Sequence, residues 1–169
     1  KDEVVFEDEG TSHGQLDRLL CVLRSVHQSF FSDRDRVSYI LEHPELADEQ
    51  ATAPPTNASG GPMDVRCLLE QQRGKILQGV EVVFSGVWPL EYPDPTKHAM
   101  YRLAVSLGCT VHQKLTSSVT HVIATRKTEK ARWARAHSRW CVTPAWLEQC
   151  HYLWERRPEL SFSLFESSA

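Results

Sequence analysis

The chain has 169 residues, of which 41% are hydrophobic and 24% are charged, and its formal net charge is −3. These values are typical of one globular domain with an extension. A weakly acidic chain is not drawn as a whole to nucleic acid or to an anionic membrane, and no stretch approaches the roughly 20 apolar residues of a membrane span. We therefore expect a protein partner. A nucleic-acid role would need the local basic patch of Arg126, Lys127, Lys130, Arg132, Arg135 and Arg139.

The cysteines are scattered singly along the chain, without a CxxC pair, which argues against a structural metal site. Their odd number and their places within apolar runs favour reduced, buried thiols in a nuclear or cytosolic protein. The first residues are a run of acids with no signal-peptide pattern. We interpret the chain as a piece of a longer protein. The five cysteines are Cys21, Cys67, Cys109, Cys141 and Cys150.

The first third of the chain predicts a helical extension. Residues 1–12 are acidic and are predicted to be a disordered leader. From Gln15 to Phe31 the apolar residues recur at helical spacing, and a weaker helical patch from residue 32 to 46 should end at Pro44. We assign residues 13–49 to this extension.

A linker and one more helix come next. Residues 50–63 include the run ATAPPTNASGGP, which is typical of a flexible linker. Residues 64–79 predict a helix that Asp64 caps and Gly79 ends. The apolar faces of both helical segments should pack on each other or on the domain that follows. The residues expected to be buried there are Leu20, Leu23, Phe30, Leu68 and Leu69.

Residues 80–165 alternate strands and helices. Apolar runs predict strands at 80–87, 110–113, 120–124 and 140–142, and helices are predicted at 95–107, 129–137 and 144–153. Gly108 should end the first of these helices. Trp146 and Cys150 share one face of the last helix and are assigned to the core. His121, beside Val122 and Ile123, is interpreted as a core or strand-end histidine rather than a catalyst. This order predicts an α/β domain with a four-stranded parallel sheet and helices on both faces.

One constellation predicts phosphate binding. Ser85 and Gly86 end the first strand, and there a hydroxyl and a closely approachable backbone N–H become available. Thr128 begins the helix that carries Lys130, and the positive end of a helix favours an anion. Lys127 is an alternative cation. The competing interpretation is that Ser85 and Gly86 form an ordinary turn after a strand.

A second motif has the residue pattern of a catalytic loop but not its expected structural context. Asp33-Arg34-Asp35-Arg36-Val37 matches DxDx(T/V), the nucleophile loop of haloacid-dehalogenase-type phosphatases. In such a loop one aspartate attacks phosphorus and the other protonates the leaving group. That loop must leave a buried strand, but here it follows a helical pattern, so we do not assign Asp33 and Asp35 to catalysis.

The domain resembles a BRCT module. In that family a Ser/Thr-Gly pair after the first strand and the lysine of a Thr-x-Lys motif form the phosphopeptide pocket. Here Ser85-Gly86 and Thr128-Glu129-Lys130 stand at the matching positions. The family's core tryptophan corresponds to Trp146. The resemblance implies the strand order 2-1-3-4 and a binding module rather than a catalyst.

A wider resemblance covers about residues 13–165. The helix ending in VHQSFF, the linker, and the stretch DVRCLLEQQRGKILQGVEVVFSGVWPL are similar to the C-terminal region of the RNA polymerase II C-terminal-domain phosphatase family. In that family a helical segment follows a haloacid-dehalogenase-type catalytic domain and precedes one BRCT domain. The catalytic DxDxT strand and its later paired aspartates are absent here. We therefore expect no catalytic residue, metal or cofactor within this chain, and a magnesium-dependent serine/threonine phosphatase only in the parent protein.

The resemblance implies a nuclear phosphoprotein-binding module linked to transcription regulation. Its expected partner is the phosphorylated polymerase tail or a transcription-factor protein. The alternative is a BRCT scaffold of a DNA-repair or replication protein, but the helices before residue 80 favour the phosphatase family.

Overall fold

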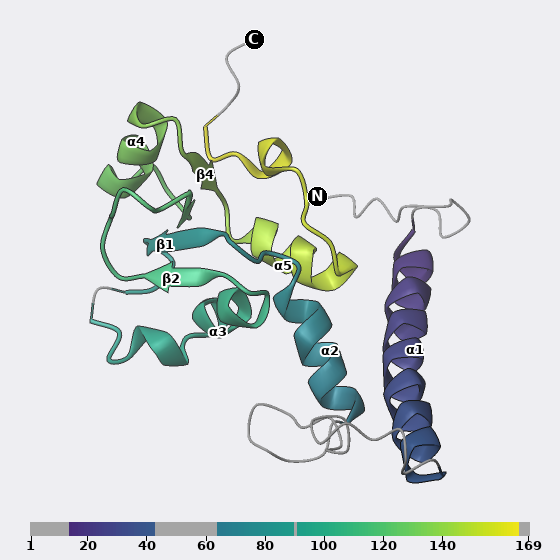
Figure 1. Ribbon diagram of the computed structural model, residues 1–169. Coiled ribbons are helices and arrows are strands. Elements are labelled where there is room, and N and C mark those ends of the chain that lie inside the picture. Colours follow the sequence, from purple (N-terminus) through teal and green to yellow (C-terminus); the bar gives the residue numbers. More distant parts are fainter. Residues whose placement is uncertain (1–13, 43–63, 90, 166–169) are drawn as a thin grey trace. The chain divides into compact units, whose positions relative to one another are not determined.

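The structure is a computed structural model that describes residues 14–42, of which 32–42 by their backbone alone, together with 64–89 and 91–165 (Figure 1). The chain divides into two compact units, with the boundary between Gln72 and Arg73. The acidic leader and the whole of the expected linker lie outside the described residues.

The first unit is helical, and its main element is α1, Gln15–Glu42. One continuous helix therefore replaces the two helical patches that the sequence predicted on either side of Ser32. Pro44, the expected terminator, lies outside the described residues.

The prediction that Leu20 and Leu23 are buried is wrong, because these side chains are 44% and 59% exposed. The covered face of α1 carries Ser25, whose hydroxyl accepts a hydrogen bond from Gln72 Nε2 at 3.1 Å. Val26, the neighbour of Ser25, is only 4% exposed. At about 100° per residue, Leu20 points away from both Ser25 and Val26, whereas Leu23 lies at the border of this face, about 60° from Val26. Leu68 is buried as predicted, whereas Phe30 and Leu69 are only half-buried.

Helix α2, Val65–Gly74, begins as predicted and ends early. The Asp64 carboxylate accepts a hydrogen bond from the Cys67 N–H at 2.9 Å, which caps the first turn. The helix ends at Gly74 rather than near Gly79, so the expected C-terminal stop is wrong. Beyond Gly74 the helical hydrogen bonds are replaced, because the Leu77 N–H donates to the Leu107 carbonyl at 2.8 Å. The backbone is close to the end of α3 there, since a Cβ on Gly108 would lie 1.9 Å from the Gly74 carbonyl oxygen. The chain turns there to reach the sheet.

The second unit contains the α/β domain. Its strands are β1 (Glu81–Ser85), β2 (Thr110–His112), β3 (His121–Ala124) and β4 (Trp140–Val142). They are all parallel, in the order β2-β1-β3-β4. Both the fold class and the strand order that the resemblance implied are confirmed.

Helices cover both faces of this sheet (Figure 1). They are α3 (Ala99–Ser106), α4 (Glu129–Ala136) and α5 (Ala145–Leu153). Two short 3-10 helices, η2 (Pro95–Lys97) and η3 (Glu159–Phe162), complete the unit. The predicted helix at 95–107 is thus η2 followed by α3, because the His98 side chain accepts from the Met100 N–H and starts a new helix there. The sequence did not predict η3.

The alternation of side chains along β1 divides the core in two. Val82 and Phe84 belong to the cluster that α3 and α5 cover, and Val83 belongs to the cluster that α4 covers. Trp146 and Cys150 are fully buried in the first cluster. Gly108 follows α3 with a φ of +93°, a conformation that favours glycine. The two core clusters, one on each face of the sheet, hold the carboxyl end of β1 next to the beginning of α4.

Candidate phosphate-binding site

The candidate site lies where the direction of the sheet connections reverses. From β1 the chain passes through α3 to β2 on one side, and the next strand, β3, pairs with β1 on the other side. In open parallel sheets, ligands bind outside the carboxyl ends of the strands at such a point. Ser85 is the last residue of β1 and pairs in register with Ala124, the last residue of β3.

The hydroxyl groups of Ser85 and Thr128 lie 2.7 Å apart and join the end of β1 to the start of α4. Thr128 is the N-cap residue of α4, and its oxygen also accepts from the Ala131 N–H at 3.3 Å. Two hydroxyl groups carry two hydrogens, and only one of these lies between them. The other remains able to donate to an incoming oxygen beside the positive end of the helix.

Lys130 brings its ammonium group to the same strand end. Its Nζ donates to the carbonyl oxygen of Phe84 at 3.2 Å and to that of Gln113 at 3.4 Å. An ammonium group has three donors, so one is left for a ligand. Burial lowers the pKa of Lys130 from its ordinary value, and a bound anion would oppose that shift by favouring the charged form.

Gly86 has a φ of +70°, and its carbonyl accepts a hydrogen bond from the Thr125 hydroxyl at 2.6 Å. Arg126 lies against it, because a Cβ on Gly86 would be 3.3 Å from Arg126 Nε. This close approach places a second cation beside Gly86. The sequence placed Arg126 in the basic patch only. Its position two residues after a buried strand end was the signal that could have found it.

Lys127, the alternative cation, has a different neighbour. Its ammonium lies 5.8 Å from the centre of the Phe165 ring, and the Arg135 guanidinium lies 5.3 Å from the same ring. The structure therefore brings together Ser85, Gly86, Thr128 and Lys130, and it places Lys127 beside the C-terminal segment.

The phosphatase-like motif has no supporting context. Asp33 and Asp35 lie within α1, so the backbone there is helical and does not leave a strand. Among the described residues, no group of three His, Cys, Asp or Glu side chains could hold a metal ion. No helix within that part of the chain is both long and apolar enough to cross a membrane.

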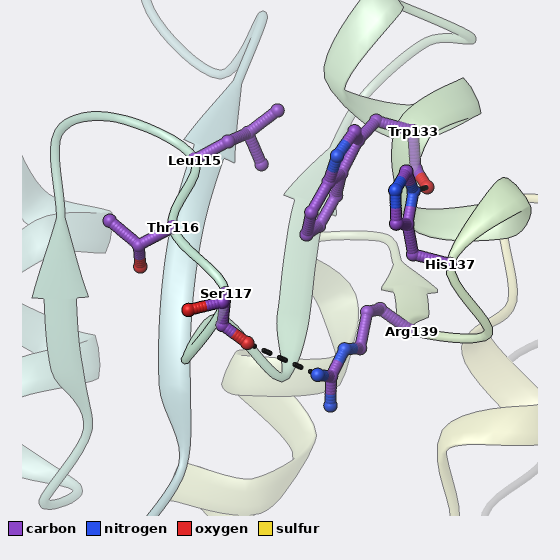
Figure 2. A pocket seen from close by; sticks show the side chains of 6 residues that line it. All are labelled: Leu115, Thr116, Ser117, Trp133, His137 and Arg139. Carbon is purple, nitrogen blue, oxygen red and sulfur yellow. Dashed lines mark hydrogen bonds between the residues drawn. The ribbon is translucent and has the colours of Figure 1, made fainter.

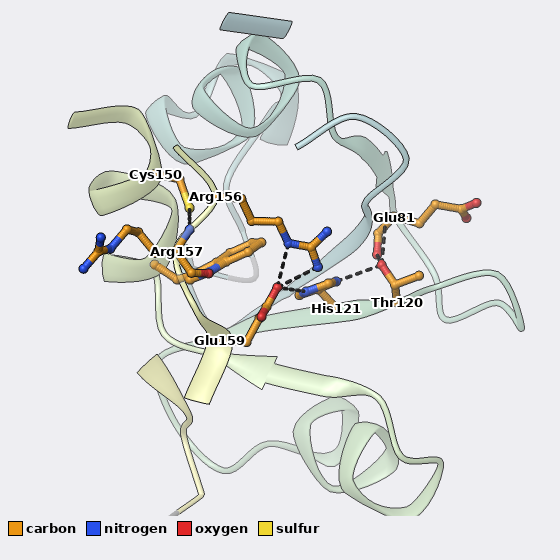
Figure 3. Close-up of polar contacts among 8 residues, drawn as sticks. Glu81, Thr120, His121, Cys150, Arg156, Arg157 and Glu159 are labelled. Carbon is orange, nitrogen blue, oxygen red and sulfur yellow. Dashed lines mark hydrogen bonds and ion pairs between the residues drawn. The ribbon is translucent and has the colours of Figure 1, made fainter. Parts of the chain in front are cut away.

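A polar network lies at the opposite end of the sheet (Figure 3). Glu159 Oε1 accepts from Arg156 Nη2 at 2.6 Å and lies 3.4 Å from Nε2 of the buried His121. His121 Nδ1 is 2.8 Å from the Thr120 hydroxyl. Burial would raise the pKa of Glu159, but Arg156 holds it below its ordinary value. Every polar atom of the imidazole has a partner, so His121 is a structural residue here, as the sequence indicated.

Comparison of the chain with known protein families gives the class of the α/β unit. Residues 72–151 match the family described as the BRCA1 C Terminus (BRCT) domain. The α/β unit is therefore a BRCT domain, with the fold that its strand order indicates.

Several known proteins are similar to this chain over most of its length, beyond the BRCT domain. RNA polymerase II C-terminal domain phosphatase-like 4 of Arabidopsis thaliana is 35% identical over 158 residues, which cover 93% of this chain and 31% of that protein. A C-terminal domain phosphatase of RNA polymerase II from Homo sapiens is 29% identical over 152 residues, 85% of this chain and 14% of that protein. The solved structure of Fcp1, an essential RNA polymerase II CTD phosphatase, matches with a TM-score of 0.67 and 26% identity, over 89% of this chain and 37% of that one.

Over nearly its whole length, the chain is thus similar to C-terminal domain phosphatases of RNA polymerase II, and this similarity includes the helical segment before the BRCT domain. It spans about a third of the length of the Arabidopsis relative and a smaller share of the human one.

Proposed function

We propose that the BRCT domain binds a phosphorylated segment of a protein partner at Ser85, Gly86, Thr128 and Lys130. The observation that carries this proposal is the pair of hydroxyl groups 2.7 Å apart, at the switch point of the sheet, with the Lys130 ammonium at the end of the same strand. A hydroxyl donor, a glycine N–H, a helix N-terminus and a cation together suit a phosphate dianion.

The partner is the phosphorylated tail of RNA polymerase II or a transcription-factor protein. The names of the relatives support this choice, because they are phosphatases of the polymerase II C-terminal domain. In this proposal the domain docks the partner in the nucleus for dephosphorylation by a catalytic domain elsewhere in the parent protein. That parent is a serine/threonine phosphatase and uses magnesium, whereas the described residues supply binding alone.

The alternative, a BRCT scaffold of DNA repair or replication, has less support. The similarity to the polymerase phosphatases extends over 93% of the chain and includes residues outside the BRCT domain. A shared BRCT domain alone would not produce that extent.

The test is a titration with a phosphoserine peptide from the polymerase tail and with its unphosphorylated twin. One BRCT domain offers one small charged site, so we expect a dissociation constant of about 0.1–1 mM for the phosphopeptide and weakening by salt. Lys130→Met should cost about 1.5–3 kcal/mol of binding free energy, because it removes a charge-assisted hydrogen bond. That loss would make binding undetectable.

Lys127→Met is the matched control, since it removes a neighbouring lysine whose ammonium lies beside Phe165. It should leave binding within about twofold of the parent. Equal affinity for the two peptides, or equal losses in the two lysine variants, would exclude the proposed site.

A further inference from the structure

A pocket of about 260 Å³ opens at the amino ends of three neighbouring strands, the end of the sheet opposite the candidate phosphate site. Val80, Thr120 and Arg139 directly precede β1, β3 and β4, and all three line the pocket. In open parallel sheets ligands usually bind at the carboxyl ends of the strands. A binding site at the amino ends therefore needs evidence of its own, and the lining groups provide it.

The buried part of the pocket lining is uncharged and already hydrogen-bonded. It is His121, whose Nδ1 lies 2.8 Å from the Thr120 hydroxyl and whose Nε2 lies 3.4 Å from Glu159 Oε1 (Figure 3). Burial lowers the pKa of His121 to about 4, so the ring is neutral at pH 7. The charge of the pocket therefore comes from its exposed residues.

Two arginines supply that charge. Arg156 donates from Nε and Nη2 to Glu159 Oε1, at 2.9 and 2.6 Å, so its positive charge is balanced by the carboxylate. Arg139 donates from Nη2 to the Ser117 carbonyl at 3.1 Å (Figure 2), which is a neutral acceptor. The other N–H groups of both guanidinium groups remain able to donate. No Asp or Glu is among the lining residues, so the pocket has one uncompensated positive charge, on Arg139.

Two residues with a positive φ open the rim of the pocket. Gly79 has a φ of +81°, and a Cβ placed on it would have no atom within 4 Å, so a ligand can approach its backbone closely. Ser138 has a φ of +53° and is exposed, and its hydroxyl is a further donor. The pocket thus presents a hydroxyl group and two guanidinium groups without a carboxylate, a combination that suits an anion.

Size and charge narrow the class of anion. A volume of about 260 Å³ is below the roughly 300–1,000 Å³ of small-molecule sites, and it suits a single side chain of a partner protein. One uncompensated charge matches a monoanion. Helix α4 ends at Ala136, two residues before Ser138, and the negative end of its dipole disfavours a doubly charged phosphate there. Trp140, which is exposed beside Arg139, offers an apolar surface to the neighbours of such a side chain.

We propose that this pocket binds the carboxylate of a glutamate or aspartate side chain in an acidic segment of a partner protein. Arg139 supplies the charge, and Arg156 and Ser138 supply further hydrogen bonds. The domain would then have a second contact point for a protein, at the other end of the sheet from Ser85 and Lys130. This inference does not depend on the proposed phosphate site, because the two sites share no residue and each can fail alone.

A first experiment builds the carboxylate into the chain. Ser138→Asp places it beside Arg139, and Ser138→Asn is the uncharged comparison of the same shape; both residue types tolerate the left-handed backbone. The dipole of α4 alone would make aspartate the less stable of the two. If the pocket holds a carboxylate, the aspartate variant of the intact chain should instead melt about 2–4 °C higher at low salt and pH 7. A melting temperature at or below that of Ser138→Asn would overturn the proposal.

The same pair of variants identifies the cation. Adding Arg139→Gln to both should remove the difference in melting temperature, because it removes the unbalanced charge. Arg135→Gln is the matched control. It removes an arginine from the same end of α4, but that guanidinium lies 5.3 Å from the centre of the Phe165 ring and does not line the pocket. The difference should survive Arg135→Gln, and its equal loss in both backgrounds would contradict the assignment to Arg139.

A second experiment measures binding itself, by ¹H–¹⁵N spectra of the intact chain. The probes are a Gly-Glu-Gly peptide blocked at both ends, its Gly-Gln-Gly twin, and inorganic phosphate. The glutamate peptide should shift the amides of Gly79, Ser138 and Trp140, with a dissociation constant of about 1–10 mM. Binding should weaken at least tenfold with the glutamine peptide, in Ser138→Asp and in Arg139→Gln, and stay within about twofold in Arg135→Gln.

Equal shifts from the glutamate and glutamine peptides, or binding that survives Ser138→Asp, would overturn the carboxylate site. Tighter binding of inorganic phosphate than of the glutamate peptide at these same amides would show that the class of anion is wrong. None of these results bears on the amides of Gly86 and Lys130, so failure of this pocket and failure of the phosphate site are distinguishable.

Discussion

Trp146 combines a fully buried indole with a hydrogen bond for its single polar atom. The ring stacks on His121 with centroids 4.9 Å apart, and Nε1 donates to the Arg157 carbonyl at 2.8 Å. We predict that Trp146→Ala lowers the free energy of unfolding of the BRCT domain by roughly 3–5 kcal/mol, because it leaves a large cavity and an unpaired carbonyl. Against a total of about 5–15 kcal/mol, much of the domain's stability would be lost.

Urea unfolding followed by circular dichroism measures this effect. Trp140→Ala is the control, since that side chain is 41% exposed at the start of β4 and its loss should change stability by about 1 kcal/mol or less. Equal unfolding midpoints for the parent and Trp146→Ala would show that the indole does not hold the core together.

His121 makes the stability of the domain depend on pH. Burial lowers the pKa of His121 from 6.5 to about 4, despite its contact with Glu159, while Arg156 opposes the charge further. Between these values the unfolded chain binds a proton that the folded chain does not, so stability is fully present above pH 6.5 and falls towards pH 4. The loss should approach about 3 kcal/mol at pH 4.

The measurement compares unfolding at pH 7 and pH 4 for the parent and for His121→Gln, which keeps a donor for Glu159. The variant should lose about 3 kcal/mol less between the two pH values than the parent. This difference isolates His121 from other groups, including His151, whose pKa burial also lowers. Two parallel pH profiles would contradict the account.

At the residue scale, the sequence predicted which side chains are buried better than it predicted their hydrogen-bond partners. The apolar neighbours Val122 and Ile123 indicated that His121 lies in the core. The contact between His121 and Glu159 joins residues 38 positions apart. Glu159 is positioned by η3, and no periodicity in the sequence predicted this short helix. Likewise, the Ser85 and Thr128 hydroxyl groups were each assigned to the site, but their contact across 43 residues is a property of the folded sheet.

Among the elements, the turn between α2 and β1 and the end of α3 constrain each other. Gly108 has a φ of +93°, and a Cβ there would lie 1.9 Å from the Gly74 carbonyl oxygen, which is backbone and cannot move aside alone. We predict that Gly108→Ala destabilises the domain by roughly 2–5 kcal/mol, the sum of a left-handed conformation and an overpacked contact.

Gly79→Ala is the matched control, because Gly79 also has a positive φ, +81°, but has open space around its Cβ position. It should cost only the conformational part, about 1–2 kcal/mol. Thermal or urea unfolding of both variants decides the matter. Equal losses would mean that the contact with Gly74 relaxes easily and does not define the end of α2.

Strands were predicted more closely than helix ends. The short, continuous apolar runs of β1, β3 and β4 fix their positions to within a few residues, since both faces of a parallel sheet are buried. The end of α2 lies against Gly108, 34 positions further along the chain, and no local signal in the sequence indicates this contact. The exposed Leu16, Leu20 and Leu23 on α1 show the reverse case: helical spacing predicts one face but does not determine what covers it.

For the molecule as a whole, the alternation of strands and helices predicted the α/β class, and the BRCT resemblance supplied the strand order. Physical pattern alone leaves several orders possible for four parallel strands. The order matters for function, because placing β3 beside β1 brings Thr128 and Lys130 to the end of the strand that carries Ser85. Neither pattern nor resemblance indicated the pocket at the amino ends of β1, β3 and β4, which is lined by residues far apart in the sequence.

The central claim, that a phosphate group binds at the end of β1, is tested most directly by ¹H–¹⁵N spectra of the chain during titration with a phosphoserine peptide and its unphosphorylated twin. We predict shifts specific to the phosphorylated peptide, concentrated at the backbone amides of Gly86, Glu129 and Lys130, because these N–H groups lie at the proposed site. Identical shifts for the two peptides, or phosphate-specific shifts confined to other parts of the domain, would show that Ser85 and Gly86 form only a turn after a strand.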